Sequence, residues 1–184
     1  ELSLMHAMKA ADCRVPDAIA TKDNRFVIKH NGDHFTAIRW VAGQTMFDVL
    51  SADPSPDGIA QIFHDLGVCL AQFHNATDAW TPKQNFHRHS WDREGLVGPR
   101  PLWGRFWDNP DLSPEERDIF IHMQNQMNDA LMHLEGTLDY GVIHADLIPD
   151  NVMIDNNEIT FLDFDDCGFG FRLFDLATIL LKQI

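Results

Sequence analysis

Two short polar motifs near the end of the chain, each bordered by apolar residues, constrain its fold more than any other feature. The first, HADLIPDN, runs from His144 to Asn151, and the second, LDFDD, runs from Leu162 to Asp166. The flanking segments GVI, VMI and ITFL are typical of short buried strands. We therefore expect the polar residues to lie in ordered loops at strand ends, and not in a disordered acidic tail.

The residues between the two motifs predict a β-hairpin. In NVMIDNNEITFLDF, the asparagine pair at 156–157 tolerates the positive φ angles of a two-residue turn. That turn would pair Asp155 with Glu158 and Asn151 with Leu162. Directly opposite residues of an antiparallel pair lie about 5 Å apart, so the polar side chains at the far end of the ladder would be close neighbours.

The predicted hairpin brings oxygen ligands to one end of its ladder. The amide of Asn151 and the carboxylate of Asp163 would meet there, and Asp146 lies five residues before Asn151. Amide and carboxylate oxygens are ligands that Mg²⁺ prefers, with water and phosphate oxygens completing its octahedron. A single Asp in such a loop is explained by hydrogen bonds to the local backbone. The full set of polar residues, His144 included, favours a catalytic metal site.

The first part of the chain predicts a helix followed by a hairpin. Apolar spacing indicates an amphipathic helix over residues 1–11, and Pro16 is expected to end it. The turn chemistry of Asn31 and Gly32, between two β-rich runs, predicts a hairpin with a type I′ turn.

Two longer helices are expected in the middle of the chain, separated by a loop-rich, tryptophan-rich segment over residues 77–112. The first helix covers about residues 58–76 and buries one stripe, which consists of Ile59, Ile62, Phe63, Leu66, Leu70 and Phe73. The second begins at SPEE, residues 113–116, which has the spacing of a capping box, and Gly136 ends it. Long irregular segments usually have a function or cover something, so the loop between the helices is expected either near a substrate site or, equally, as packing beneath a long surface loop.

Composition limits the partners of the chain. A formal net charge of −14 argues against nucleic acid, whose phosphates need a basic surface, but it is compatible with metal ions and cationic substrates. No segment is apolar enough to span a membrane. Three widely spaced cysteines indicate reduced thiols and a cytoplasmic protein. The sequence leaves the oligomeric state open.

The spacing H-x-D-x₄-N, followed by D-F, resembles the catalytic core of the protein-kinase-like superfamily. The closer resemblance is to the aminoglycoside phosphotransferase/choline kinase-like branch, carried by VIHADLIPDNVMID and by ITFLDFDDCGFGFRLFDLA. It implies an α+β, protein-kinase-like bilobal fold, with a partial small-lobe hairpin and a mostly helical large lobe that contains short catalytic β-hairpins. The implied boundaries are a small lobe over 1–39, a hinge over 40–44 and a large lobe over 45–184.

The resemblance also implies roles for residues of the two motifs. Asp146 would be the catalytic base that accepts the proton of a substrate hydroxyl, and His144 would brace its loop. Asn151 and Asp163 would hold Mg²⁺ at the nucleotide phosphates. Asp175, in FDLA, would be a structural acid that ties a helix start to the catalytic loop, although an ordinary acid at a helix N-terminus explains it equally well.

Further residues are implied by position alone. The backbone of Trp40, Val41 and Ala42 would bind the adenine edge, and Glu1 lies where the family has the glutamate that pairs with the phosphate-binding lysine. The second motif has DFDD where protein kinases have D-F-G, so Asp165 and Asp166 would add carboxylates near the metal or the substrate.

Some family features differ or are missing. Ala145 stands where the branch usually has glycine, and the chain has neither a glycine-rich phosphate loop nor a lysine in a suitable preceding strand. We therefore expect the chain to be a piece of a longer protein that binds nucleotide poorly by itself.

The function expected from this resemblance is ATP- and Mg²⁺-dependent transfer of the γ-phosphoryl group to a hydroxyl of a small-molecule acceptor, of the aminoglycoside, choline or homoserine kind. The alternatives are a bacterial protein Ser/Thr kinase of the same fold and a non-catalytic kinase-like binding protein. A metal-dependent hydrolase that uses some of the ten histidines, such as His87 and His89, is a weaker alternative because their spacing does not suit one helix face.

Overall fold

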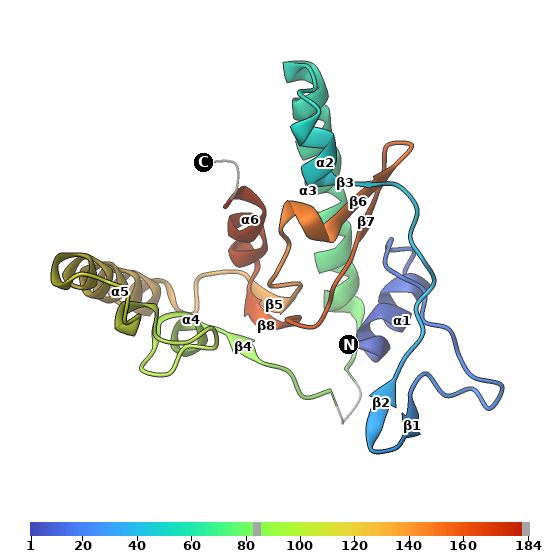
Figure 1. Ribbon diagram of the computed structural model, residues 1–184, viewed down its shortest axis with the longest axis horizontal. Coiled ribbons are helices and arrows are strands. Elements are labelled where there is room, and N and C mark those ends of the chain that lie inside the picture. The colour runs from blue at the N-terminus through green and yellow to red at the C-terminus, as the bar shows by residue number, and fades with distance from the viewer. Residues whose placement is uncertain (83–85, 182–184) are drawn as a thin grey trace.

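The computed structural model describes residues 1–82 and 86–181, so the loop-rich segment expected at 77–112 lies partly outside the described residues. Helices and short strands alternate along the chain (Figure 1). The α-helices are α1 (Leu2–Ala10), α2 (Met46–Ser51), α3 (Pro56–Ala79), α4 (Arg93–Val97), α5 (Pro114–Leu134) and α6 (Arg172–Leu180), and the 3₁₀ turns are η1 (Phe106–Asp108) and η2 (Pro149–Asn151). The strands are β1 (Ile28–His30), β2 (Asp33–Phe35), β3 (Gln44–Thr45), β4 (Ser90–Trp91), β5 (Tyr140–Ile143), β6 (Val152–Asp155), β7 (Glu158–Phe161) and β8 (Gly168–Phe171).

The described strands form three small sheets. Strands β1 and β2 pair with each other, β3 joins the β6–β7 hairpin in the order β3-β6-β7, and the third sheet has the order β4-β8-β5. The last two sheets bring together segments that are far apart in sequence, because β3 and β4 come long before the strands they pair with. The first polar motif lies in the loop between β5 and β6, and the second lies in the loop between β7 and β8. Each loop therefore begins where a strand of one of these sheets ends.

The β6–β7 hairpin has the register predicted from the sequence. Asp155 pairs with Glu158, and the backbone N–H of Leu162 donates to the carbonyl of Asn151 at 2.8 Å. The turn asparagines have φ angles of 49° and 65°, as a type I′ turn requires. The predicted small-lobe hairpin is also present, with φ angles of 51° and 94° at residues 31 and 32, although its two strands are exposed.

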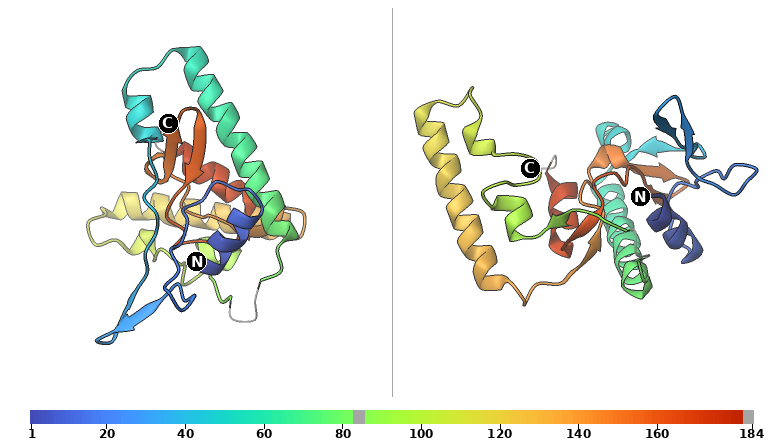
Figure 2. Two further views of the ribbon diagram at one scale, coloured as in Figure 1. Left: turned by 90° about the vertical axis from the view of Figure 1, so that its right-hand side faces the viewer. Right: turned by 90° about the horizontal axis from the view of Figure 1, so that it is seen from below.

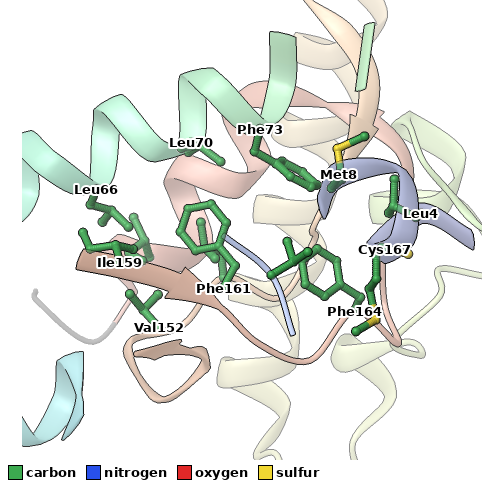
Figure 3. Packing of buried hydrophobic residues seen from close by; sticks show 14 of the residues in the cluster. Leu4, Met8, Leu66, Leu70, Phe73, Val152, Ile159, Phe161, Phe164 and Cys167 are labelled. Atoms are coloured by element: carbon green, nitrogen blue, oxygen red, sulfur yellow. The ribbon is translucent and has the colours of Figure 1, made fainter. Parts of the chain in front are cut away.

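The core lies where α3 and α1 cover the β6–β7 hairpin and the loop after it. Figure 3 shows side chains from these elements packed together, with Phe73 of α3 beside Phe161 and Phe164. The ring centroid of Phe73 lies 6.1 Å from that of Phe161 and 5.9 Å from that of Phe164. These aromatic contacts therefore hold α3 against the end of β7 and the start of the second polar motif.

Helix α3 is longer than predicted, and one member of its stripe is misassigned. The Oγ of Ser55 accepts from the N–H of Gly58 and caps the helix, which then begins with proline. Ile59 is 37% exposed and not buried, so the buried stripe begins further along α3 than predicted. Leu66, Leu70 and Phe73 are buried as predicted.

The two other predicted helices differ in how they are buried. Helix α1 buries Leu4, Met5 and Met8. It ends at Ala10, well before Pro16, and the chain turns away two residues later, where Asp12 has a φ of 59°. Helix α5 begins with the predicted capping box at Ser113, yet no residue of this fully described helix is buried. Figures 1 and 2 show α5 to one side of the core, next to α4.

Two expectations drawn from composition can be compared with the structure. Among the described residues, no helix has both the length and the apolar content needed to cross a membrane. The three cysteines, all within the described ranges, are free thiols.

We predict that Phe73→Ala lowers the free energy of unfolding by about 3–5 kcal/mol, because it removes a ring that is 1% exposed and leaves a cavity between α3 and the hairpin. Val68→Ala on the exposed side of the same helix is the control, with an expected change below about 1 kcal/mol. Urea denaturation measures both values, and similar losses in the two variants would contradict this description of the core.

Candidate active site

The first polar motif is organised around the buried carboxylate of Asp175. This residue lies in the first turn of α6 and is 0% exposed. Its two oxygens accept from the backbone N–H groups of His144 and Ala145 at 3.1 and 2.7 Å, and Nε2 of His74 in α3 lies 2.8 Å from Oδ2. One carboxylate therefore joins α3, α6 and the loop of the first polar motif.

Thr178, one turn further along α6, adds a second anchor. Its Oγ1 accepts from the N–H of Leu147 at 3.2 Å and donates to the carbonyl of Asp175 at 2.9 Å. Ala145 lies between these anchors with a φ of 72°. This left-handed conformation explains why a glycine would suit the position, and the bonds to α6 hold an alanine there instead.

His144 is enclosed by the loop and not directed at the solvent. Its Nε2–H donates to the carbonyl of Leu162 at 2.7 Å, and its Nδ1 lies 3.4 Å from the N–H of Asp146. Burial lowers the pKa of His144, against the opposing charge of Asp175 and smaller contributions from other groups. The imidazole is therefore neutral near pH 7, and it links the first polar motif to the start of the second.

Asp146 and Asn151 are held together by the loop. The Nδ2 of Asn151 donates to both the carbonyl and the Oδ2 of Asp146, at 2.9 Å each. These two bonds use the nitrogen of the Asn151 amide and not its oxygen. They fix the direction of the half-buried Asp146 carboxylate, beside which the Asn151 amide supplies an uncharged oxygen.

The second motif gathers carboxylates beside the first. Asp163, exposed at the end of the hairpin, has a φ of 58°. Desolvation raises its pKa, and the hydrogen bond to Asp165 and the charges of Asp165 and Asp146 raise it further. The pKa of Asp166 is raised by burial and by the charges of Asp165 and Asp146. These carboxylates therefore lie within electrostatic reach of one another.

Such a group of acids is suited to a divalent cation. A positive ion would offset the negative charge of these carboxylates, and the available donors are hard oxygens. No group of three or more His, Cys, Asp or Glu side chains forms a ready-made metal cage in the part of the chain that the structure describes. Mg²⁺ commonly takes only one or two protein carboxylates and completes its shell with water and phosphate, so Asn151 and Asp163 are the residues that could hold it.

Arg88 was not identified from the sequence as a site residue, although it contacts the second motif directly. Its Nε donates to the carbonyl of Cys167 at 2.6 Å, and its Nη2 donates to the carbonyl of Phe164 at 2.8 Å and to that of Asp165. The indole of Trp91 donates to the carbonyl of Asp166 at 2.8 Å. No spacing rule connects residues so far apart in sequence, so only the pairing of β4 with β8 reveals them.

His74 was likewise missed as a site residue, since its bond to Asp175 spans 101 positions of the chain.

A cleft of about 400 Å³ lies between the predicted hinge and the hairpin. Its lining includes Trp40, Val41, Asp163 and Glu1, together with apolar residues of α1 and the hairpin. Ala42, the third predicted hinge residue, is not part of this lining. The side chain of Trp40 is 90% exposed.

The predicted hinge segment lies close to β6 at Gly43. This residue has a φ of 117°, and a Cβ atom there would collide with the carbonyl of Ile154. Glycine therefore allows the chain to pass directly over β6, the strand that follows the first polar motif.

Comparison with known proteins identifies the class of protein. The model of the Phosphotransferase enzyme family matches residues 1–183, and the chain belongs to this family. A solved structure of a microcompartment-associated aminopropanol kinase matches with a TM-score of 0.77 and 28% identity, and the match covers 97% of this chain and 56% of that one. The predicted α+β kinase-like fold is confirmed.

Two curated relatives illustrate the range of the family. The amicoumacin kinase of Bacillus subtilis is 27% identical over 124 residues, which are 67% of this chain and 34% of the relative. A homoserine kinase of Allorhizobium ampelinum is 24% identical over 184 residues, covering 97% of this chain and 51% of the relative. The chain thus spans about a third to a half of the length of these proteins.

The depressed pKa of His144 predicts a loss of stability in mild acid. The unfolded chain binds a proton below a pKa of about 6.5, whereas the buried imidazole does not, so proton binding favours unfolding as the pH falls. Between pH 7.5 and 5.5, wild-type protein should lose more stability than His144→Gln, by at most about 1.4 kcal/mol per pH unit. Urea denaturation at both pH values measures this.

The control for this measurement is His30→Gln, on the exposed hairpin. The part of the pH dependence that belongs to His144 is the difference between the two variants. Equal pH dependence in both would show that His144 is not held neutral by burial.

Proposed function

We propose that this protein transfers the γ-phosphoryl group of ATP to a hydroxyl group of a small-molecule acceptor, with Mg²⁺ as cofactor. The observation that carries the proposal is the arrangement of the two motifs. Asp146 is held by Asn151 at 2.9 Å, and Asp163 lines the same cleft as the predicted hinge residues Trp40 and Val41. A nucleotide in that cleft would extend from the hinge toward the carboxylates.

In this proposal Asp146 is the catalytic base. Its carboxylate would accept a hydrogen bond from the acceptor hydroxyl, orient it toward the γ-phosphate and take its proton. The new P–O bond would form as the bond from the γ-phosphorus to the bridging oxygen breaks and ADP leaves. The bond from Asn151 Nδ2 restricts the rotation of this carboxylate. His144, buried and neutral, positions the loop and transfers no proton.

Asn151 and Asp163 would supply the protein ligands of the metal. Mg²⁺, when bound, would neutralise charge on the phosphate oxygens during transfer. The contribution of this chain is to present one amide oxygen and one carboxylate at the open end of the β6–β7 hairpin, where its two strands begin and end. Asp165 and Asp166 lie on the adjacent loop, where their charge would attract either the metal or a cationic group of the acceptor.

The nucleotide base would lie at the hinge. We propose that residues 40–44 join a small lobe over 1–39 to a large lobe over 45–184, and that the backbone at Trp40 and Val41 binds the adenine edge. Ala42 would contribute less, because it does not line the cleft. Glu1 lines the same cleft as Asp163, which supports its proposed pairing with a phosphate-binding lysine elsewhere in the protein.

The acceptor proposed here is a small amino alcohol or a related cationic compound. The names of the similar proteins mention amicoumacin, homoserine and aminopropanol, and the last two compounds carry both a hydroxyl and an amine. The carboxylates of Asp165 and Asp166 would complement such an amine. Three free thiols fit a reducing compartment, so we propose that the reaction occurs in the cytoplasm.

We predict that Asp146→Asn in the full-length protein lowers kcat by about 10²–10⁴-fold, because the amide cannot accept the hydroxyl proton. Binding of ATP should change by less than about twofold, since Asp146 is not proposed to contact the nucleotide. Asp155→Asn, at the far tip of the hairpin, is the control, and its kcat should match that of the wild type. Equal turnover in Asp146→Asn and wild type would refute the assignment.

We predict that Asp163→Ala abolishes the dependence of nucleotide binding on Mg²⁺. Calorimetric titration of AMP-PNP with and without Mg²⁺ should give a large difference in Kd for the wild type and little or none for the variant. Circular dichroism checks that the variant is folded. A variant that keeps the full Mg²⁺ effect would place the metal elsewhere.

A screen of full-length protein with γ-labelled ATP separates the alternatives. Its acceptors are amino alcohols, hydroxy amino acids, aminoglycosides, sugars and generic protein substrates. Transfer to an amino alcohol or hydroxy amino acid is expected. Transfer to protein alone would favour a protein Ser/Thr kinase, and nucleotide binding without any transfer would favour a non-catalytic binding protein.

A further inference from the structure

Arg88 binds the backbone of the loop that carries the second polar motif. The loop over residues 163–167 belongs to no helix or strand, and its backbone carbonyls point toward the segment that leads into β4. The guanidinium of Arg88 donates to the carbonyls of Phe164, Asp165 and Cys167. One side chain therefore satisfies three acceptors within four consecutive residues.

The surrounding contacts keep Arg88 in place. The next residue, His89, accepts from the N–H of Phe169 at 2.9 Å, and Ser90 and Trp91 pair with β8. Trp91 is 1% exposed, and its indole donates to the carbonyl of Asp166. Four successive carbonyls of the loop, from Phe164 to Cys167, are thus bound by two neighbouring side chains.

This arrangement has an electrostatic and a geometric effect. A positive charge behind the loop offsets the repulsion among the acids on its other side, and the charge of Arg88 acts to lower the pKa of Asp166. The planar guanidinium has several N–H donors in fixed directions, so it can hold several carbonyls at once. A lysine in the same place would keep the charge but could not reproduce this geometry.

We propose that Arg88 is a positioning residue of the phosphoryl-transfer site, which fixes the 163–167 loop so that Asp163 faces the cleft in the orientation that Mg²⁺-nucleotide binding requires. This inference rests on the proposed function, because it assigns the metal to Asp163. Arg88 itself touches neither the cleft nor the metal site, and it acts only through the loop backbone.

The first test measures the loop without any ligand. In full-length protein, hydrogen–deuterium exchange of the peptide that contains residues 163–167 should be faster in Arg88→Lys and Arg88→Gln than in the wild type. Exchange in the β6–β7 hairpin should be unchanged. The control is Arg100→Lys, since Arg100 is an exposed arginine in the following loop. Unchanged exchange at 163–167 in both Arg88 variants would overturn the inference.

The second test measures the metal. The Mg²⁺ concentration that gives half of the maximal AMP-PNP binding should rise about 10- to 100-fold in Arg88→Lys, the range typical for residues that orient metal ligands. Arg100→Lys should match the wild type. A lower thermal midpoint with an unchanged Mg²⁺ requirement in the folded protein would show a merely structural role and would also overturn the inference.

The two proposals fail in different ways. If wild-type protein transfers no phosphoryl group to any acceptor, the proposed function fails, while the exchange experiment still reports on the loop. If wild-type protein is active and Arg88→Lys keeps the wild-type Mg²⁺ requirement, only the role of Arg88 fails.

Discussion

The carboxylate of Asp175 is the interaction on which the site depends. A fully buried charge is tolerated only when hydrogen bonds replace its hydration, and here two backbone N–H groups and His74 do so. Removing one partner of a buried charge typically costs about 3–5 kcal/mol, so the three elements that meet at Asp175 are strongly coupled. The same bonds hold Ala145 in its left-handed conformation and thereby set the direction of Asp146.

At the cleft, by contrast with the hydrogen-bonded Asp175, several carboxylates lie close together. Desolvation raises the pKa values of Asp163 and Asp166, and the charges of Asp165 and Asp146 raise them further. A protein retains such an arrangement when a ligand compensates for it, and a divalent cation with a nucleotide would do so. Arg88 on the far side of the loop supplies part of the compensation in the protein itself.

Local sequence rules predicted the parts of the fold that local geometry determines. The 156–157 turn set the hairpin register, the capping box set the start of α5, and the spacing of the first motif predicted that Asp146 and Asn151 would be neighbours. The contacts that hold the site together could not be predicted in this way. The bond from His74 to Asp175 spans 101 positions, and the bonds from Arg88 to the loop span 76 to 79. The exposure of Ile59 also differs from the prediction, because the spacing of apolar residues does not show which turns of a helix are covered.

We propose that the hairpin presents Asn151 and Asp163 to one divalent cation at a nucleotide. A crystal structure of the full-length protein with AMP-PNP and Mg²⁺ would show whether it does. We expect a metal ion within about 2.0–2.1 Å of the Asn151 amide oxygen and of an Asp163 carboxylate oxygen, in contact with the phosphates. A nucleotide bound in the cleft whose metal contacts neither side chain would contradict it.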